Sequence, residues 1–186
     1  MQYPRVSLYA LMLATVGIPL YVHLPRFAAV ELGMGLGTLG SLLLVLRLVD
    51  VVQDPLLGAM VDRFPKAQPL FAHGAALCVA VGFALLFSLQ AGMTWAFVVL
   101  LILLFTGYSL GSILIYGRSA ALAVPGQPQA LLRLAAWREG GQILGVLLAA
   151  ALPSLLLAAG AGAQTWMFFG LSLGSLAIVA SWVSRP

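Results

Sequence analysis

Six apolar stretches, each about as long as a membrane-spanning helix, account for almost the whole chain. We place them at residues 7–30, 38–61, 70–90, 95–122, 131–159 and 166–182. An α-helix needs about 20 apolar residues to cross a hydrocarbon core about 30 Å thick. Hydrophobic residues make up 62% of the sequence and charged residues only 8%, which is more apolar surface than a soluble core buries. The sequence therefore predicts an all-α membrane protein in which residues 1–186 form a single bundle of six transmembrane helices.

Basic residues are distributed unequally between the two ends of the predicted spans. Short loops separate the spans, so successive helices should run antiparallel and alternate loops should lie on the same side of the membrane. Arg26 falls on one side, and the other side receives Arg5, Arg63, Lys66, Arg118, Arg133 and Arg185. Because Lys and Arg are enriched in cytoplasmic loops, we expect both termini in the cytoplasm and the protein in a bacterial-type inner (plasma) membrane.

Three charged side chains interrupt the second apolar stretch. Residues 47–54 read Arg-Leu-Val-Asp-Val-Val-Gln-Asp, with Arg47, Asp50 and Asp54 at positions i, i+3 and i+7 of one helix face. Each Asp or Arg at the centre of a spanning helix costs roughly 2.5 to 3.5 kcal/mol to insert. Charges kept inside a membrane at this cost mark ion or substrate pathways. The second span is therefore the first place to look for a functional site.

A second charged pair, Arg138 and Glu139, lies about two turns into the fifth span. Two positive and three negative charges within the membrane sum to minus one, so one carboxylate remains if the two arginines neutralise the others. A proton or a sodium ion would satisfy that acid, and its binding would link cation uptake to a conformational change. Two other interpretations stay open: a purely structural cluster of ion pairs, and a water-exposed charge without coupling.

The sequence gives no support to an enzyme or a nucleic-acid-binding protein. It contains no Ser-His-Asp order, paired metal-binding histidines, Cys-x-x-Cys or glycine-rich phosphate loop. His23 and His73 are expected at opposite membrane faces, and the net charge of +4 is not gathered into a basic and aromatic stripe outside the spans. We therefore expect no cofactor apart from a coupling ion, and partners limited to the lipid bilayer, a small solute and other membrane segments.

Residues 47–63 (RLVDVVQDPLLGAMVDR) resemble the second helix and following loop of the glycoside-pentoside-hexuronide:cation symporters. This is the melibiose permease family within the major facilitator superfamily. The similarity extends to residues 19–33 (PLYVHLPRFAAVELG), 107–117 (GYSLGSILIYG) and 135–153 (AAWREGGQILGVLLAAALP), which resemble parts of the first, fourth and fifth helices of that family. The resemblance implies half of a major facilitator fold, built as two inverted three-helix repeats.

The resemblance also implies roles for individual residues. Asp50 and Asp54 match the carboxylates that bind the coupling cation in this family, and Gln53 takes the place of a polar neighbour of that site. In this interpretation Arg47, Arg138 and Glu139 are their charge partners. The residues that match the superfamily's conformational loop motif are Gly58, Asp62 and Arg63.

The solute is expected to bind between polar and aromatic side chains of the first, fourth and fifth spans. Trp137 neighbours Arg138 and is either a wall of that site or a simple packing residue. The full set of candidates is Thr15, Tyr21, Tyr108, Ser112, Tyr116 and Trp137. The resulting functional hypothesis is cation-coupled secondary transport of a sugar or a related small solute. The alternative is a non-transporting membrane subunit or assembly module whose charges pair with a partner.

Facilitators of this kind carry two six-helix halves, and six predicted spans correspond to one half. Three explanations are open. The chain is an N-terminal fragment of a longer protein, a half-transporter that pairs with a parallel copy of itself by two-fold symmetry, or a bundle that has lost transport. Each of the first two supplies a second six-helix half, either as the missing C-terminal half or as the second copy.

Overall fold

Long helices form nearly all of the structure, a computed structural model that describes residues 3–121 and 128–183. The first span consists of α1 (Tyr3–Ile18), a π-helical turn (Pro19–His23) and α2 (Leu24–Val30). The other spans are α3 (Leu36–Arg63), α4 (Gln68–Leu86), α5 (Thr94–Ala121), α6 (Pro128–Ala158) and α7 (Thr165–Val183), with short 3-10 turns at Pro65–Ala67 and Gly162–Gln164. The described residues contain six helical spans long and apolar enough to cross a membrane, and no strand. The predicted all-α, six-helix fold is confirmed.

The helices begin and end within four residues of the expected boundaries, and the largest differences are at the start of the first span, where α1 begins at Tyr3, and at the end of the third. The third span was expected to reach Gln90, whereas α4 ends at Leu86. Turn hydrogen bonds from Ser88 and Leu89 to the carbonyls three residues earlier replace the helical pattern, and Gly92 adopts a positive φ of 90°. The expected end of the fourth span at residue 122 lies outside the described residues.

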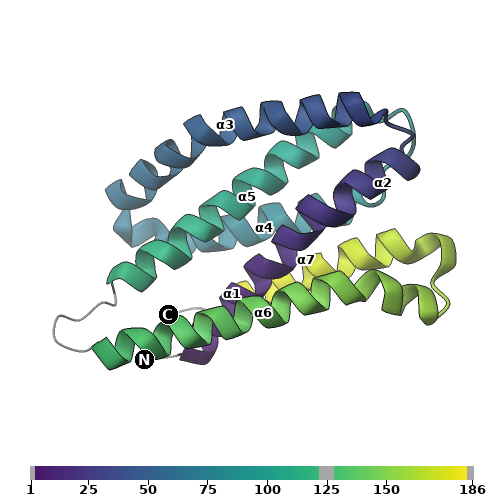
Figure 1. The fold of residues 1–186 in the computed structure, drawn as a ribbon. Coiled ribbons are helices and arrows are strands. Elements are labelled where there is room, and N and C mark those ends of the chain that lie inside the picture. The colour runs from purple at the N-terminus through teal and green to yellow at the C-terminus, as the bar shows by residue number, and fades with distance from the viewer. Residues whose placement is uncertain (1–2, 122–127, 184–186) are drawn as a thin grey trace.

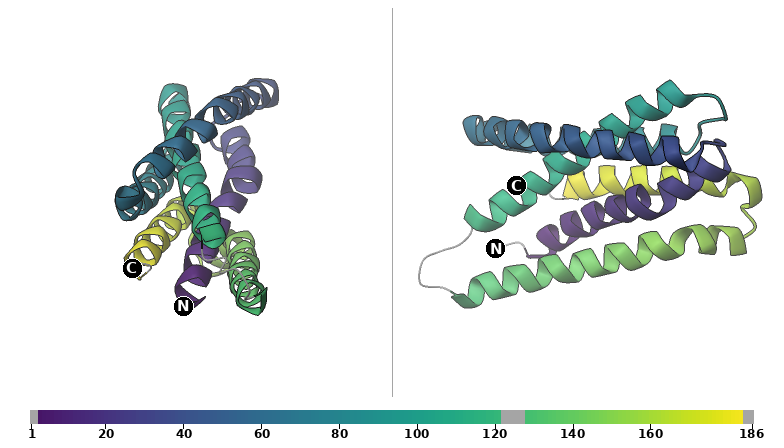
Figure 2. Two further views of the ribbon diagram at one scale, coloured as in Figure 1. Left: turned by 90° about the vertical axis from the view of Figure 1, so that its left-hand side faces the viewer. Right: turned by 45° about the horizontal axis from the view of Figure 1, so that its top comes forward.

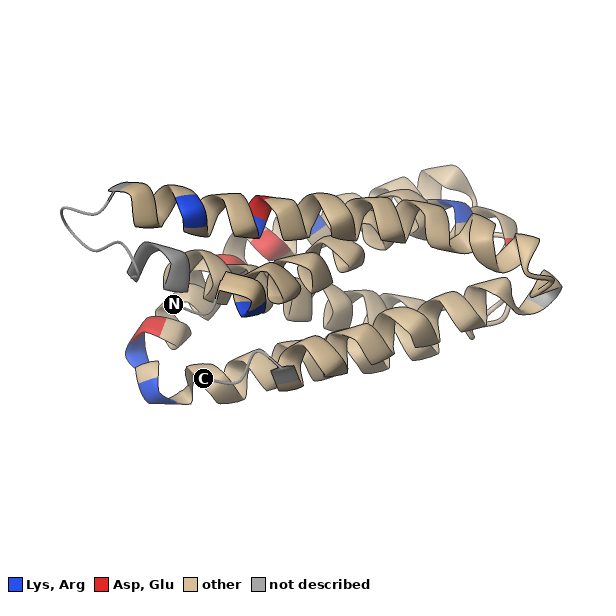
Figure 3. Cartoon of the chain, turned by 90° about the horizontal axis from the view of Figure 1, so that it is seen from below, with Lys and Arg blue, Asp and Glu red and all other residues tan. Residues whose placement is uncertain are grey.

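The helices are inclined to one another and return both termini to the same end of the bundle (Figures 1 and 2). α1 packs along α6, α4 lies between α5 and α7, and α3 packs mainly on α5. Charged residues are sparse in the middle of the bundle, and most basic residues lie toward the end that holds the termini (Figure 3). The few charges at mid-depth therefore stand out against an apolar background.

Glycines set the closest approaches between helices. A Cβ added at Gly145 on α6 would overlap the carbonyl oxygen of Leu11 on α1 and would lie 2.9 Å from the Cβ of Ala14. A Cβ at Gly170 on α7 would likewise overlap the carbonyl oxygen of Phe83 on α4. Other glycines in equally close contact are Gly82, Gly107, Gly111, Gly141 and Gly174. Because lipid tails are as apolar as leucine, such close backbone packing is a main source of helix association in membranes.

A histidine on the first span repairs a break in the hydrogen bonding of α6. Pro153 lies inside α6 and has no N–H, so the carbonyl of Ala149, four residues earlier, lacks its helical donor. His23 Nε2 donates a hydrogen bond to this carbonyl over 3.1 Å, and its ring meets Phe169 edge-on with centroids 5.3 Å apart. A neighbouring helix must supply such a donor in hydrocarbon, where water is absent. His23 therefore joins the first and fifth spans.

We expect Gly145→Val to disrupt the contact between α1 and α6. The added side chain overpacks the interface and should cost roughly 1 to 3 kcal/mol. Gly140→Val is the matched control on the same helix, because a Cβ there meets nothing within 4 Å. Thermal unfolding in detergent, followed by circular dichroism, should show a loss of stability for the first variant only. Equal stability of the two variants would contradict this packing.

We expect His23→Phe to destabilise the bundle by about 1 kcal/mol, because the aromatic ring is kept but the donor to Ala149 is lost. Pro153→Ala restores a backbone N–H four residues after Ala149. In that background His23→Phe should cost much less, as measured by the same unfolding assay on all four proteins. Equal costs in the two backgrounds would show that His23 acts by packing alone.

Candidate functional site

Arg47 and Asp50 form an ion pair on α3, near the middle of the second span. Arg47 Nη1 donates to Asp50 Oδ2 over 2.9 Å, as the spacing i, i+3 on one helix face allows. The Asp50 side chain is 11% exposed and that of Arg47 is 44% exposed. Asp50 thus faces α5 and the bundle interior, while Arg47 lies at the edge of the buried face.

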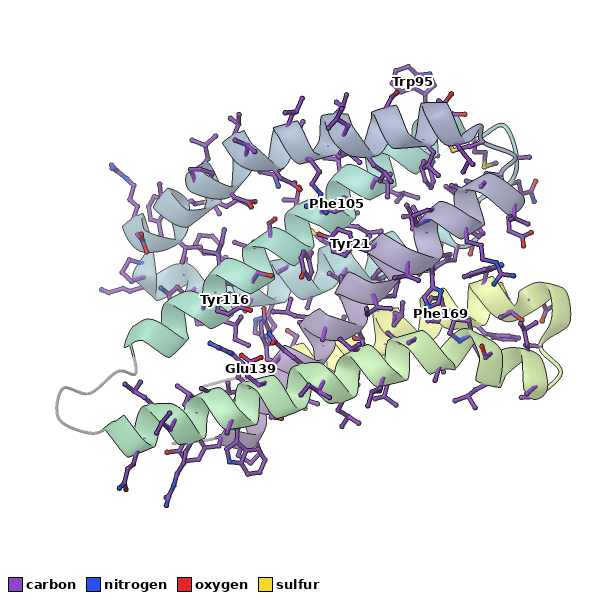
Figure 4. The ribbon with its side chains drawn as sticks, in the orientation of Figure 1. Tyr21, Trp95, Phe105, Tyr116, Glu139 and Phe169 are labelled. Atoms are coloured by element: carbon purple, nitrogen blue, oxygen red, sulfur yellow. The ribbon has the colours of Figure 1, made fainter. Side chains whose placement is uncertain are left out.

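Two aromatic rings from other helices hold the Arg47 guanidinium. Its Cζ atom lies 4.8 Å from the centroid of Tyr21 in the π-helical turn and 4.7 Å from that of Phe105 on α5. The rings meet edge-on at 68° with centroids 6.2 Å apart, and Figure 4 shows them near the centre of the bundle. We call Tyr21 and Phe105 the aromatic wedge. Cation–π attraction is worth about 0.5 to 1 kcal/mol at exposed sites and about 2 kcal/mol or more where water is excluded. Arg47 and Tyr21 are exposed in this bundle, whereas Phe105 is buried.

Asp54 and Gln53 lie one turn beyond Asp50 on α3. Asp54 is exposed, and within the described residues it belongs to neither of the two ion pairs. Gln53 Oε1 accepts a hydrogen bond of 3.2 Å from Thr106 Oγ1 on α5, and its buried Nε2 has no hydrogen-bond partner in the described structure. The three expected cation-site residues therefore share about one turn and a half of helix, and Gln53 bonds to α5.

Thr106 is a site residue that sequence reasoning does not identify. Its hydroxyl lies 3.2 Å from Gln53 Oε1 and 2.7 Å from the carbonyl of Ile102, so it adds a neutral oxygen beside the acidic turn of α3. The available signal is weak: Thr106 is one of several hydroxyl residues in this part of the fourth span, followed by Tyr108, Ser109 and Ser112. Carboxylate, amide and hydroxyl oxygens together are the ligands that a hard cation prefers.

The residues of the second charged pair, Arg138 and Glu139, bond to each other. Arg138 donates to Glu139 Oε1 through Nε over 3.1 Å and through Nη2 over 2.7 Å. The guanidinium also lies 5.0 Å from the ring centroid of Tyr116 on α5, whose hydroxyl accepts a hydrogen bond from Gln142. Figure 4 shows Tyr116 and Glu139 facing the space between α5 and α6. Neither Arg138 nor Glu139 forms an ion pair with Asp50 or Asp54 in the described structure.

The two ion pairs determine which charges of the site are neutralised within the protein. Arg47 forms an ion pair with Asp50 and Arg138 forms one with Glu139, so each arginine neutralises one acid. Of the three carboxylates that lie well inside the spans, Asp50, Asp54 and Glu139, Asp54 is the one without an ion pair among the described residues. A group of three or more His, Cys, Asp or Glu side chains placed to hold a metal ion does not occur in the described part of the chain.

The other expected solute-site residues divide into two groups. Tyr108 lies within electrostatic range of Tyr21, Tyr116 and Arg47 and shares a hydrogen bond with Ser112, so it lies between the two charged clusters. Trp137 is 47% exposed on α6, beside Arg138. Thr15 lies elsewhere: it is 2% exposed, and its hydroxyl bonds to the carbonyl of Met12 inside α1.

The loop motif expected from the sequence lies at the end of α3. α3 ends at Arg63, and Asp62 and Arg63 are both exposed. A Cβ added at Gly58 would meet nothing within 4 Å, so the surface at this glycine is open to contact with other helices. The motif residues are therefore accessible on the surface of the bundle.

Comparison with known proteins gives one finding. A family model described as MFS/sugar transport protein matches residues 6–185, nearly the whole chain. A search of curated proteins and a search of solved structures each returned no match.

Proposed function

This chain belongs to the family of MFS/sugar transport proteins, and from that membership we propose that it takes part in cation-coupled transport of a sugar or a related small solute. The family is one of transporters, so the protein is not an enzyme. Its six long apolar helices make it an integral membrane protein. The specific resemblance to the melibiose permease group and the coupling to a cation are parts of the proposal.

One observation carries the coupling proposal: within the part of the chain that the structure describes, Asp54 has no ion pair and lies one turn from the buried Asp50. Charging an unpaired carboxylate inside a membrane is costly, so a bound proton or sodium ion stabilises this arrangement. Sodium would take oxygen ligands from Asp50, Asp54, Gln53 and Thr106, and a proton would reside on a carboxylate.

The charge state of Asp54 would link cation binding to a change of conformation. A negative Asp54 favours a conformation that exposes it to water, whereas a neutralised Asp54 tolerates closure of the surroundings. The solute is proposed to bind against the polar and aromatic surface that runs from Tyr21 through Tyr108 to Tyr116, with Arg138 and Trp137 at its edge. Hydroxyl-rich solutes suit this surface because guanidinium and tyrosine groups supply donors and acceptors side by side.

The packing pattern supports an arrangement as two inverted three-helix repeats. An inverted repeat would exchange the first three spans with the last three, so that α1 takes the place of α5, α3 that of α6, and α4 that of α7. Under this exchange the α1–α6 contact corresponds to the α5–α3 contact, and the α1–α7 contact corresponds to the α5–α4 contact. The α4–α7 contact corresponds to itself. All of these contacts are present. The second helix of each triplet, α3 and α6, has the smallest buried share among the six spans. Only 17% and 22% of their most apolar stretches are buried.

The two sparsely covered helices are the proposed surface for a second six-helix half. Either a C-terminal half or a parallel second copy related by two-fold symmetry would complete the transporter and cover part of these faces. The bias of basic residues toward one end of the bundle supports cytoplasmic termini in a bacterial-type inner membrane.

We expect Asp54→Asn to abolish solute accumulation driven by a cation gradient, because the variant offers no negative charge for a proton or sodium ion to neutralise. Proteoliposomes carrying an imposed sodium or proton gradient would be tested with a panel of radiolabelled mono- and disaccharides. Glu31→Gln, a change at an exposed acid that follows α2 and accepts a hydrogen bond from Trp166, controls for the loss of one charge because glutamine keeps that acceptor. Accumulation by Asp54→Asn at the wild-type rate would overturn the coupling role. A stable complex with another membrane protein, and no flux, would favour the non-transporting alternative.

A further inference from the structure

The geometry points to a role for the aromatic wedge that involves no contact with the cation: Tyr21 and Phe105 are positioning residues that keep Arg47 from competing with the coupling cation for Asp50. They would set the cation affinity of the site through Arg47 alone. This inference rests on the proposed function, because it specifies how that same site is tuned.

The ion pair between Arg47 and Asp50 is a one-point contact. Only Nη1 of the guanidinium bonds to the carboxylate, through Oδ2 at 2.9 Å. A guanidinium that is free to move prefers two parallel bonds to a carboxylate. By comparison, Arg138 donates from two nitrogens to Glu139, both of them to Oε1. The arginine on α3 is therefore held back from the arrangement that would occupy Asp50 most fully.

The wedge accounts for this restraint. Tyr21 and Phe105 come from two other spans and hold the guanidinium carbon at 4.8 and 4.7 Å from their ring centroids. Phe105 is 3% exposed and is fixed by the packing around it, so its ring is a rigid wall. Oδ1 of Asp50 is left without a bond to Arg47 and remains available to a cation.

The wedge also stabilises the cation-bound state. When a cation shares Asp50, the attraction between Arg47 and that carboxylate weakens. Without another partner, the arginine would then be a poorly compensated charge in the membrane, which opposes cation binding. The two ring faces supply that partner in both states. Loss of a ring should therefore raise the free energy of the cation-bound state more than that of the cation-free state.

The test is cation binding to the purified full chain. Binding of radioactive sodium would be measured directly, and proton binding by difference titration of the wild type against Asp54→Asn. We expect Phe105→Leu and Tyr21→Leu each to weaken binding about fivefold, because only the part of the lost cation–π attraction that differs between the cation-bound and cation-free states changes the affinity. Phe105→Tyr, which keeps the ring, should stay within about twofold. Phe97→Leu, a fully buried phenylalanine near the start of α5, is the control for lost packing.

A double-mutant cycle with Arg47→Gln decides the mechanism. In that background Phe105→Leu should have no effect on cation affinity, because there is no guanidinium left to position. The same loss with and without Arg47, or equal losses for Phe105→Leu and Phe97→Leu, would overturn the inference. Tyr21→Leu keeps the test valid if Phe105→Leu fails to fold. A wild-type protein that binds neither cation would instead overturn the proposed function on which the inference rests.

Discussion

A charge inside a membrane must be compensated by the protein, and Arg47 is where this requirement joins three spans. Its guanidinium bonds to Asp50 on its own helix and lies against Tyr21 from the first span and Phe105 from the fourth. Removal of any one partner leaves a charge that the remaining two must stabilise. Under the proposed coupling, a change in the charge state of the acidic residues on α3 would act on its position relative to the first and fourth spans through these contacts.

Close backbone packing is distributed unevenly over the bundle. Glycines bring α1 against α6, α4 against α7 and α5 against α4, at distances that no larger residue permits. On α3, by contrast, Cβ atoms added at Gly40 or Gly58 would meet nothing within 4 Å. The helix that carries the acids is held by Leu39, Leu46, Val61 and a few polar contacts rather than by interlocked backbone. Side-chain charge thus has most influence on the helix with the least steric restraint.

The sequence predicts the features that are local to one helix. Hydropathy identifies the six spans, and the spacing i, i+3 indicates that Arg47 and Asp50 share a face. Contacts between helices depend on crossing angles and rotations that no single segment specifies. The approach of Arg138 to the ring of Tyr116, the approach of Thr106 to Gln53, and the bond from His23 to the carbonyl freed by Pro153 therefore emerge only in three dimensions.

The two arginine clusters are alike in position but not in charge. Under the proposed inverted repeat, Arg47 and Tyr21 join the second and first helices of one triplet, and Arg138 and Tyr116 join the corresponding helices of the other. Each arginine pairs with one acid, yet only α3 carries a further acid one turn away. A symmetric scaffold with one additional carboxylate gives the two triplets different responses to a cation. Conformational change driven by cation binding would then begin in the first triplet, while the second keeps its charge neutralised throughout.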